Sequence, residues 1–148
     1  MINVREVTKD DAIAWAAMRA SLWPDADVDE LKAEAVAHFD SPTMLERVFI
    51  CEGPDGAPIG MLELSLRSHA DGCTSSPVPY VEGWYVAADR RGIGVGRALM
   101  RSAEAWSRAN GYREIASDCL LTNDASASAH HALGFEEIDR NITFRKAL

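Results

Sequence analysis

Arg91-Gly92-Ile93-Gly94-Val95-Gly96 joins a predicted strand, Tyr80 to Ala87, to a predicted helix, Val95 to Asn110. Glycine has no Cβ, so a glycine-rich backbone lets an anion approach its amides closely. The free amides at the start of a helix form a concave anion site, and the helix dipole strengthens it. Three arginines in or beside the turn add positive charge to a chain whose formal net charge is −8. The turn therefore predicts the pyrophosphate site of a nucleotide cofactor.

The glycine spacing separates this turn from two other phosphate sites. A Walker loop has Lys followed by Ser or Thr after its last glycine, whereas Arg97-Ala98 stands here. The dinucleotide-binding fingerprint has a different glycine spacing and opens a parallel unit, whereas this turn comes late, after a predicted antiparallel region. An ordinary glycine-rich turn between a strand and a helix remains the alternative.

The remaining segments predict a mixed α/β protein with the order βααβββαβαβ. The chain has 148 residues and shows no linker or internal repeat, so we expect a single domain over residues 1–148. The Ser68 to Pro79 stretch predicts a long loop, and Gly83 predicts a bulge in the strand that precedes the glycine turn. Strands are predicted at 2–7, 47–52, 59–67, 80–87, 113–118 and 135–146, and helices from 9 to Pro24, at 28–39, 95–110 and 124–133.

Composition narrows the class of partner. The acidic balance, with a sequence pI near 4.9, argues against nucleic acid and anionic membranes as partners; it suits a cationic substrate or simply keeps the protein soluble. Cys51, Cys73 and Cys119 are odd in number and lack metal-ligand spacing, so we expect no metal and a reducing compartment. Neither a signal peptide nor a run of about 18 apolar residues is found, which predicts a cytoplasmic protein.

A second motif follows the predicted strand 113–118. It begins at Asn123 and ends with Leu133-Gly134-Phe135, and together with Arg91-x-x-Gly94-x-Gly96 it resembles the GCN5-related N-acetyltransferase (GNAT) family. The resemblance covers essentially the whole chain, since the order of elements also matches. It implies the GNAT fold, an α/β fold with a central, mostly antiparallel sheet, a splayed parallel pair and about four flanking helices. It also implies acetyl-CoA as the co-substrate.

The resemblance places the cofactor on two parts of the chain. Pantetheine would lie between the splayed strands and pair with backbone groups of Trp84, Tyr85 and Val86, like an added strand. One of these amides would polarise the thioester carbonyl, and Asn123 would contact the cofactor near the last helix. The pyrophosphate would lie on the turn formed by Arg91, Gly92, Ile93, Gly94, Val95, Gly96 and Arg97.

His130 stands where many family members have a tyrosine that donates a proton to the leaving thiolate. An imidazole can also donate a proton, so His130 is a candidate catalytic acid. The alternative is that His130 packs against its neighbours or binds the cofactor.

Two carboxylates are candidates for handling the acceptor amine. Glu82 lies beside the predicted bulge at Gly83, and Asp118 ends the neighbouring predicted strand. An amine attacks only when neutral, so a nearby carboxylate can take its proton directly or through water. The alternative for Glu82 is an outward-facing, solvated side chain.

Further stretches resemble the aminoglycoside 6'-N-acetyltransferase subfamily. They are Leu22-Trp23-Pro24, residues 71–78 with Val81-Glu82-Gly83, Ala116-Ser117-Asp118, and the segment from His130 to Glu137. This similarity implies acetyl transfer to the 6'-amine of aminoglycosides, antibiotic resistance and a homodimer. It implies an acceptor site formed by Trp23, Glu82 and Asp118, with His69 and Asp139 as further contacts.

Two other functions remain open. A protein or polyamine acetyltransferase would use the same chemistry, with an open groove in place of an acidic pocket. A non-catalytic acyl-CoA-binding module would keep the glycine turn but would have no need for Glu82 and Asp118 between the splayed strands.

Overall fold

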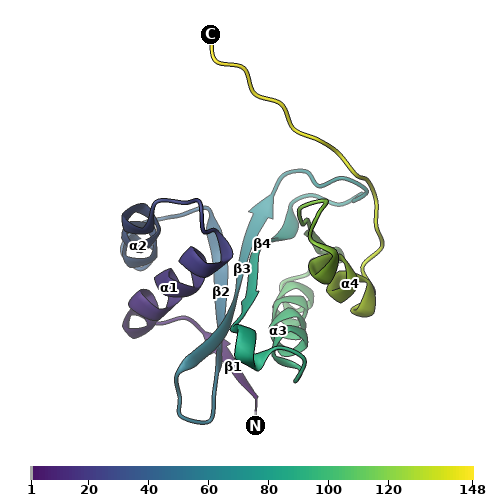
Figure 1. The fold of residues 1–148 in the computed structure, drawn as a ribbon. Helices are drawn as coiled ribbons and strands as arrows, with labels where there is room; N and C mark the ends of the chain where they lie inside the picture. Colours follow the sequence, from purple (N-terminus) through teal and green to yellow (C-terminus); the bar gives the residue numbers. More distant parts are fainter. Residues whose placement is uncertain (1) are drawn as a thin grey trace.

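Five strands form one sheet in the order β1-β2-β3-β4-β5 in the computed structural model, which describes residues 2–148 (Figure 1). The first four strands pair antiparallel, and β5 pairs parallel to β4, as the predicted fold requires. The strands are β1 (Asn3–Glu6), β2 (Leu45–Glu52), β3 (Pro58–Arg67), β4 (Val78–Val86) and β5 (Ala116–Ser117). The α-helices are α1 (Ala12–Leu22), α2 (Val28–Ala37), α3 (Val95–Ala109) and α4 (Asp124–Ala132), with short 3-10 turns η1 (Lys9–Asp11) and η2 (Ala88–Arg90).

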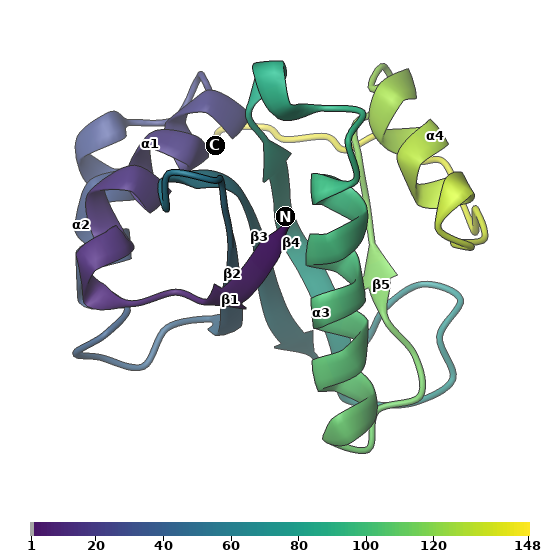
Figure 2. The ribbon, with the colours of Figure 1, turned by 90° about the horizontal axis from the view of Figure 1, so that it is seen from below.

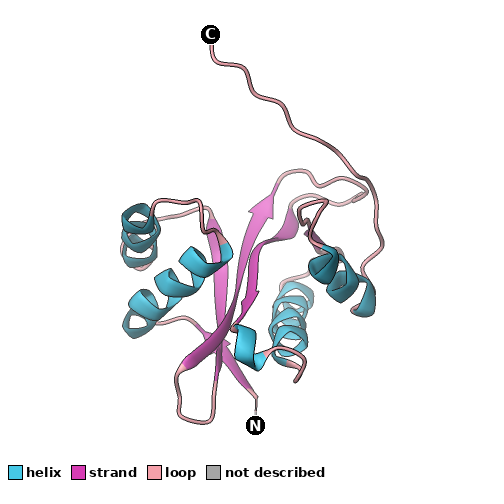
Figure 3. Ribbon diagram, viewed as in Figure 1, coloured by secondary structure: helices cyan, strands magenta, loops and turns pink. Residues whose placement is uncertain are grey.

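Helices cover both faces of the sheet (Figures 2 and 3). Helices α1 and α2 lie on one side, and α3 and α4 lie on the other. Because successive side chains of a strand point to opposite faces, Val48 and Ile50 of β2 pack with α1, whereas Phe49 and Cys51 pack with α3. The strands and the helices that cover them therefore bury two cores, one on each face.

Side chains cap the starts of η1 and α2. Thr8 and Asp11 form a capping box around the 3-10 turn that precedes α1. The Asp27 carboxylate accepts hydrogen bonds from the amides of Asp29 and Glu30 at 2.9 and 3.1 Å. These side chains satisfy amides that have no acceptor within the helix, which is why the helices begin at these positions.

The predicted bulge at Gly83 is confirmed. Glu63 of β3 lies opposite Gly83, but the next residue, Leu64, lies opposite Val81. Glu82 is therefore the extra residue of the bulge and has no partner across the ladder. The Glu82 side chain of this bulge contacts Ser65 and Arg67 of β3.

Strands β4 and β5 separate after two pairs of residues. Tyr80 pairs with Ala116 and Val81 with Ser117, while β4 continues to Val86 without β5 beside it. The strand predicted at 113–118 is thus only two residues long, because β4 has turned away from it. The separation leaves one edge of β4 open just before the glycine turn.

The strand predicted at 135–146 is wrong for this chain. Residues 135–148 have no strand assignment; Phe135 still packs against the core, and the chain then leaves the body of the protein as an extended segment (Figure 1). Ile142 and Phe144 alternate with polar residues, yet they are 68% and 88% exposed. An alternating pattern becomes a strand only when a neighbouring strand takes its backbone hydrogen bonds, and this segment lies against none.

Among the helices of residues 2–148, none combines the length and the apolar character needed to cross a membrane.

Candidate active site

The glycine turn begins α3 in a conformation that only glycine adopts readily. Gly92 and Gly94 have φ angles of 79° and 97°, in the left-handed region. Gly94 is the N-cap of α3 and offers no side chain to cap it, so the amides of the first turn, from Val95 onward, have no acceptor within the helix. The turn therefore presents free amides and the positive end of a 15-residue helix to an anion.

Two contacts fasten the turn to the end of β4. The Arg91 guanidinium donates to the carbonyl of Val86 at 3.0 Å, and the Trp84 indole donates to the carbonyl of Gly96 at 3.1 Å. A Cβ at Gly96 would lie 3.3 Å from the Trp84 ring, so the helix approaches the strand closely here. Arg97 lies on another side of α3, where it lines a hollow of about 440 Å³ together with Ile2 of the N-terminal segment.

The open edge of β4 can pair with an extended ligand. Trp84, Tyr85 and Val86 pair with β3 through one edge, and β5 has already left the other. A pantetheine chain could take the place of the missing strand, as added strands do in peptide recognition. The residues predicted for pantetheine thus lie on one open edge that leads to the glycine turn.

Glu82 is held by a serine and an arginine of β3. Its carboxylate accepts from Ser65 Oγ at 2.6 Å, and from Nε and one terminal nitrogen of Arg67 at 2.8 Å each. Burial tends to raise the pKa of the Glu82 carboxyl, but these hydrogen bonds outweigh it and hold that pKa below its usual value. Glu82 is therefore an ionised, half-buried carboxylate and not a solvated surface side chain.

Asp118 connects to Glu82 through two intervening side chains. The Tyr80 hydroxyl donates to Asp118 at 2.5 Å, and the Arg67 guanidinium lies 3.6 Å from the centre of the Tyr80 ring. Burial and the Asp118 charge raise the pKa of the Tyr80 hydroxyl, so it remains a proton donor to the carboxylate. The structure therefore brings the two predicted carboxylates into one chain of contacts, Glu82–Arg67–Tyr80–Asp118.

Trp23 covers the bulge from the end of α1. A Cβ at Gly83 would lie 3.0 Å from the Trp23 ring, so the indole rests directly on the glycine. The Arg19 guanidinium lies 5.3 Å from the ring centre of Trp23 and binds buried Glu63 at 2.7 Å. Burial raises the pKa of Glu63, and the Arg19 charge opposes that rise. This ion pair fixes Trp23 over the strand that carries Glu82.

His130 connects α4 to the separating strands. Its Nε2 lies 2.7 Å from Ser117 Oγ and its Nδ1 lies 2.7 Å from the Ser126 carbonyl. A carbonyl only accepts, so Nδ1 carries a proton and Nε2 of the neutral ring accepts from Ser117. The ring also meets Trp84 edge-on at 5.2 Å. His130 thus reaches the open edge of β4.

The other predicted residues lie in different surroundings. Asn123 caps α4, since its side-chain oxygen accepts from the Ser126 amide at 3.0 Å. His69 is 78% exposed and lies 3.3 Å from Asp71. Asp139 lies on the extended C-terminal segment, is exposed, and accepts from the neighbouring Arg140 amide. No contact of His69 or Asp139 with Glu82 or Asp118 is present among the described residues.

The sequence pattern alone does not single out Ser65, Arg67, Tyr80, Arg19 or Glu63. Period-two alternation does place Glu63, Ser65 and Arg67 on one face of β3, which is a signal that polar side chains gather there. What joins them to Tyr80 and Asp118 is the pairing of β3 with β4 and of β4 with β5.

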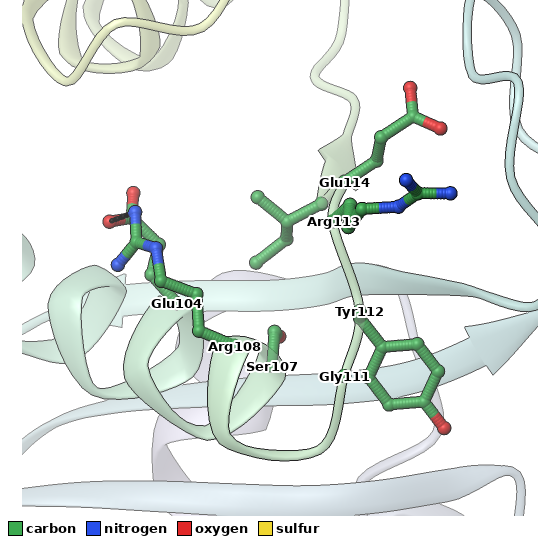
Figure 4. Close-up of a pocket in the computed structure, with 8 residues that line it drawn as sticks. Glu104, Ser107, Arg108, Gly111, Tyr112, Arg113 and Glu114 are labelled. Atoms are coloured by element: carbon green, nitrogen blue, oxygen red, sulfur yellow. Dashed lines mark hydrogen bonds and ion pairs between the residues drawn. The ribbon is translucent and has the colours of Figure 1, made fainter.

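Glu114 fastens the long loop beside the site. One oxygen of its carboxylate accepts from the amides of Thr74 and Ser75 at 2.9 and 2.8 Å and from the Ser75 hydroxyl at 2.5 Å. These bonds lower the pKa of Glu114 to about 2. A hollow of about 430 Å³ opens next to Glu114, between the end of α3 and the segment that leads into β5 (Figure 4). Neither Glu82 nor Asp118 lines it, so it is separate from the contacts of these two carboxylates.

Comparison with known proteins identifies relatives along nearly the whole chain. Residues 12–135 match the Acetyltransferase (GNAT) family. Aminoglycoside N(6')-acetyltransferase type 1 of Klebsiella aerogenes is 45% identical over 98% of this chain and 96% of its own, and that of Stenotrophomonas maltophilia is 42% identical over 99% and 94%. The solved structure of AAC(6')-Iy with the bisubstrate analogue CoA-S-monomethyl-acetylneamine has a TM-score of 0.89 and 34% identity, and covers 100% of this chain and 99% of that one.

Proposed function

This chain belongs to the GNAT family of acetyltransferases, and we propose that it transfers the acetyl group of acetyl-CoA to the 6'-amine of aminoglycosides. The names of its relatives, at 42–45% identity over nearly full length, support this acceptor. So does a relative of the same fold that binds a CoA–neamine bisubstrate analogue. Acetyl-CoA is the co-substrate.

One observation carries the proposal: β4 and β5 separate after two residue pairs, and the opening between them would serve both substrates. The edge of β4 that faces this opening leads to the glycine turn at one end. At the other end it carries Glu82, with Asp118 across the opening on the neighbouring segment. An acyl donor on the turn and a cationic acceptor at the carboxylates would meet over the same few residues.

The residues of the donor site fit acetyl-CoA. The turn of Arg91 to Arg97 would hold the pyrophosphate through its free amides, because its left-handed glycines and its position at the N-terminus of α3 suit an anion. Trp84 to Val86 would pair with pantetheine, and Asn123 would contact the cofactor from α4. For Arg97 and Asn123 these roles remain predictions, since Arg97 lies toward Ile2 and the Asn123 oxygen caps a helix.

The acceptor site would bind ammonium groups and release one proton. We assign Glu82 and Asp118 to this work, with Trp23 covering the acceptor and with His69 and Asp139 as further contacts. The neutral amine attacks the thioester carbonyl, a C–N bond forms and the C–S bond breaks. The proton of the amine passes to a carboxylate directly or through water. We assign His130, which lies at the open edge of β4, to return a proton to the thiolate once its Nε2 carries one.

The decisive experiment measures thioester consumption with aminoglycosides, polyamines and peptides as acceptors. We expect turnover with aminoglycosides that carry a 6'-amine and none with analogues that carry a 6'-hydroxyl. Faster turnover of polyamines or peptides would contradict the proposal and identify those amines as the acceptors. Binding of acetyl-CoA without turnover of any acceptor would identify a binding module.

We also propose that the protein is a homodimer. The C-terminal segment, residues 136–148, exposes Ile142, Phe144 and Leu148. β5 is the last strand of the sheet, so its outer edge lies open beside the hollow of Figure 4. In a twofold dimer, the C-terminal segment of each copy would lie against the open edge of β5 in the other copy. Light scattering should give twice the chain mass for the wild type and the single mass for Ile142→Asp/Phe144→Asp; a monomeric wild type would contradict the proposal.

The setting of the protein follows from the same assignment. We propose that residues 1–148 act as a single acetyltransferase domain in the cytoplasm, where acetyl-CoA is available, and that the protein confers aminoglycoside resistance. Expression in a susceptible bacterium should raise the inhibitory concentration of kanamycin, and the Asp118→Asn variant should not.

A further inference from the structure

We propose that Arg67 determines the specificity of the acceptor site, because its guanidinium occupies Glu82 as an internal counter-ion that a substrate ammonium group must displace. The inference rests on the proposed function, since it requires a cationic acceptor. Arg67 is not among the residues that the resemblance to the subfamily implies.

The first support is the geometry of the pair. Arg67 binds Glu82 through two nitrogens at 2.8 Å each, one to each carboxylate oxygen, and Ser65 adds a third hydrogen bond at 2.6 Å. An ionised carboxylate is an acceptor only, with about four lone-pair positions for both oxygens. Three are already taken, so an incoming ammonium group finds the carboxylate occupied and a positive charge beside it.

The second support is the difference in exposure between the partners. The Arg67 side chain is 43% exposed, whereas that of Glu82 is 15% exposed. The exposed guanidinium can turn into water, whereas the Glu82 carboxylate would have to give up its Ser65 hydrogen bond to move. The half-buried carboxylate stays where the bulge places it. Displacement therefore moves Arg67 and leaves Glu82 available, with a pKa released from the lowering effect of the guanidinium.

The third support is that one guanidinium contacts both Glu82 and the tyrosine that binds Asp118. Arg67 lies 3.6 Å from the centre of the Tyr80 ring, and the Tyr80 hydroxyl binds Asp118 at 2.5 Å. A ligand that displaces Arg67 from Glu82 therefore also uncovers the tyrosine that holds Asp118. An acceptor with several ammonium groups can replace Arg67 at Glu82 and also reach Asp118. A monoamine can replace Arg67 but has no second ammonium group for Asp118. Arg67 thus favours polycationic acceptors over simple amines.

The variant Arg67→Met tests this inference, since it keeps an unbranched apolar stem over Tyr80 and removes the charge. Calorimetry with kanamycin should show about fivefold tighter binding than the wild type, the size expected for one surface ion pair. The KM for kanamycin should fall in step, and the KM for acetyl-CoA should not change. Affinity for a simple primary amine such as glucosamine should rise by a larger factor. Arg67→Lys should restore the wild-type values.

Arg47→Met is the matched control. Arg47 also lies on a strand, 5.3 Å from the centre of an aromatic ring, Trp106, and pairs with a glutamate. Arg47→Met changes the net charge by the same amount as Arg67→Met but outside the site, so the affinity for kanamycin should stay at the wild-type value. Equal or weaker binding of kanamycin to Arg67→Met, or no binding to either protein, would overturn the counter-ion role. The proposed function is judged separately, by thioester consumption of the wild type.

Discussion

Gly94→Ala tests the glycine turn with a single methyl group. Gly94 has a φ of 97°, where an L-residue costs about 1–2 kcal/mol. The new Cβ would lie 3.4 Å from Ile2, an ordinary van der Waals distance, so the cost is backbone strain and not collision. In the unliganded Gly94→Ala variant the turn can leave the left-handed conformation, and CoA binding must then restore it. The affinity for CoA should then fall by that strain, about 5- to 30-fold.

Isothermal calorimetry with CoA measures this effect, and Gly56→Ala is its control. Gly56 has a φ of 80° and nothing within 4 Å of its Cβ position, but it lies in the β2–β3 hairpin, away from the turn. Hydrogen bonds of Gly53 to Ala57 and of Gly56 to Gly53, at 2.8 and 3.0 Å, hold that hairpin in place. Its strain should therefore appear as a loss of about 1–2 kcal/mol in the free energy of unfolding, with CoA affinity unchanged.

Wild-type CoA affinity in Gly94→Ala, beside a measurable loss of stability in Gly56→Ala, would refute the assignment of the turn. The left-handed backbone would then be strained by an alanine, as in Gly56→Ala, but CoA binding would not depend on the conformation of Gly94. Equal losses of CoA affinity in both variants would also refute it, because the effect would follow global stability.

Variants at three other places in the structure test further predictions. Asp118→Asn and Glu82→Gln should each lower kcat/KM for kanamycin about 10- to 1000-fold, the loss of a base or a charged contact, and leave calorimetric CoA affinity intact; undiminished turnover would remove their roles. Arg19→Met should lower the free energy of unfolding in urea by about 3–5 kcal/mol, because it leaves the Glu63 charge buried without its ion-pair partner. Arg19→Met/Glu63→Gln should recover most of it, because the neutral amide still accepts from the Trp15 indole; additive losses would contradict this. Glu114 has a folded-state pKa lowered to about 2 from 4.5, so its stabilisation is present above pH 4.5 and disappears toward pH 2. Glu114→Gln should make urea stability fall less steeply over that interval, and an unchanged slope would contradict the bond to the loop.

The acceptor site shows how far a linear pattern reaches. The bulge at Gly83 and the carboxylates at Glu82 and Asp118 follow from the sequence, because a glycine within a strand and a charge beside it are local signals. The counter-ion does not. Arg67 lies 15 residues before Glu82, and Tyr80 lies 38 residues before Asp118. Strand register brings these residues together, and register depends on the whole sheet.

Short stretches of sequence are enough to predict the glycine turn before α3 and the bulge at Gly83. Each depends on interactions within a few residues. Which stretches lie beside one another is a property of the fold. The glycine turn could be read as an anion site, but the separation of β4 from β5 decides that its ligand can continue toward Glu82. Residues 135–148 carry a strand pattern without a partner strand, because pairing belongs to two segments and not to one.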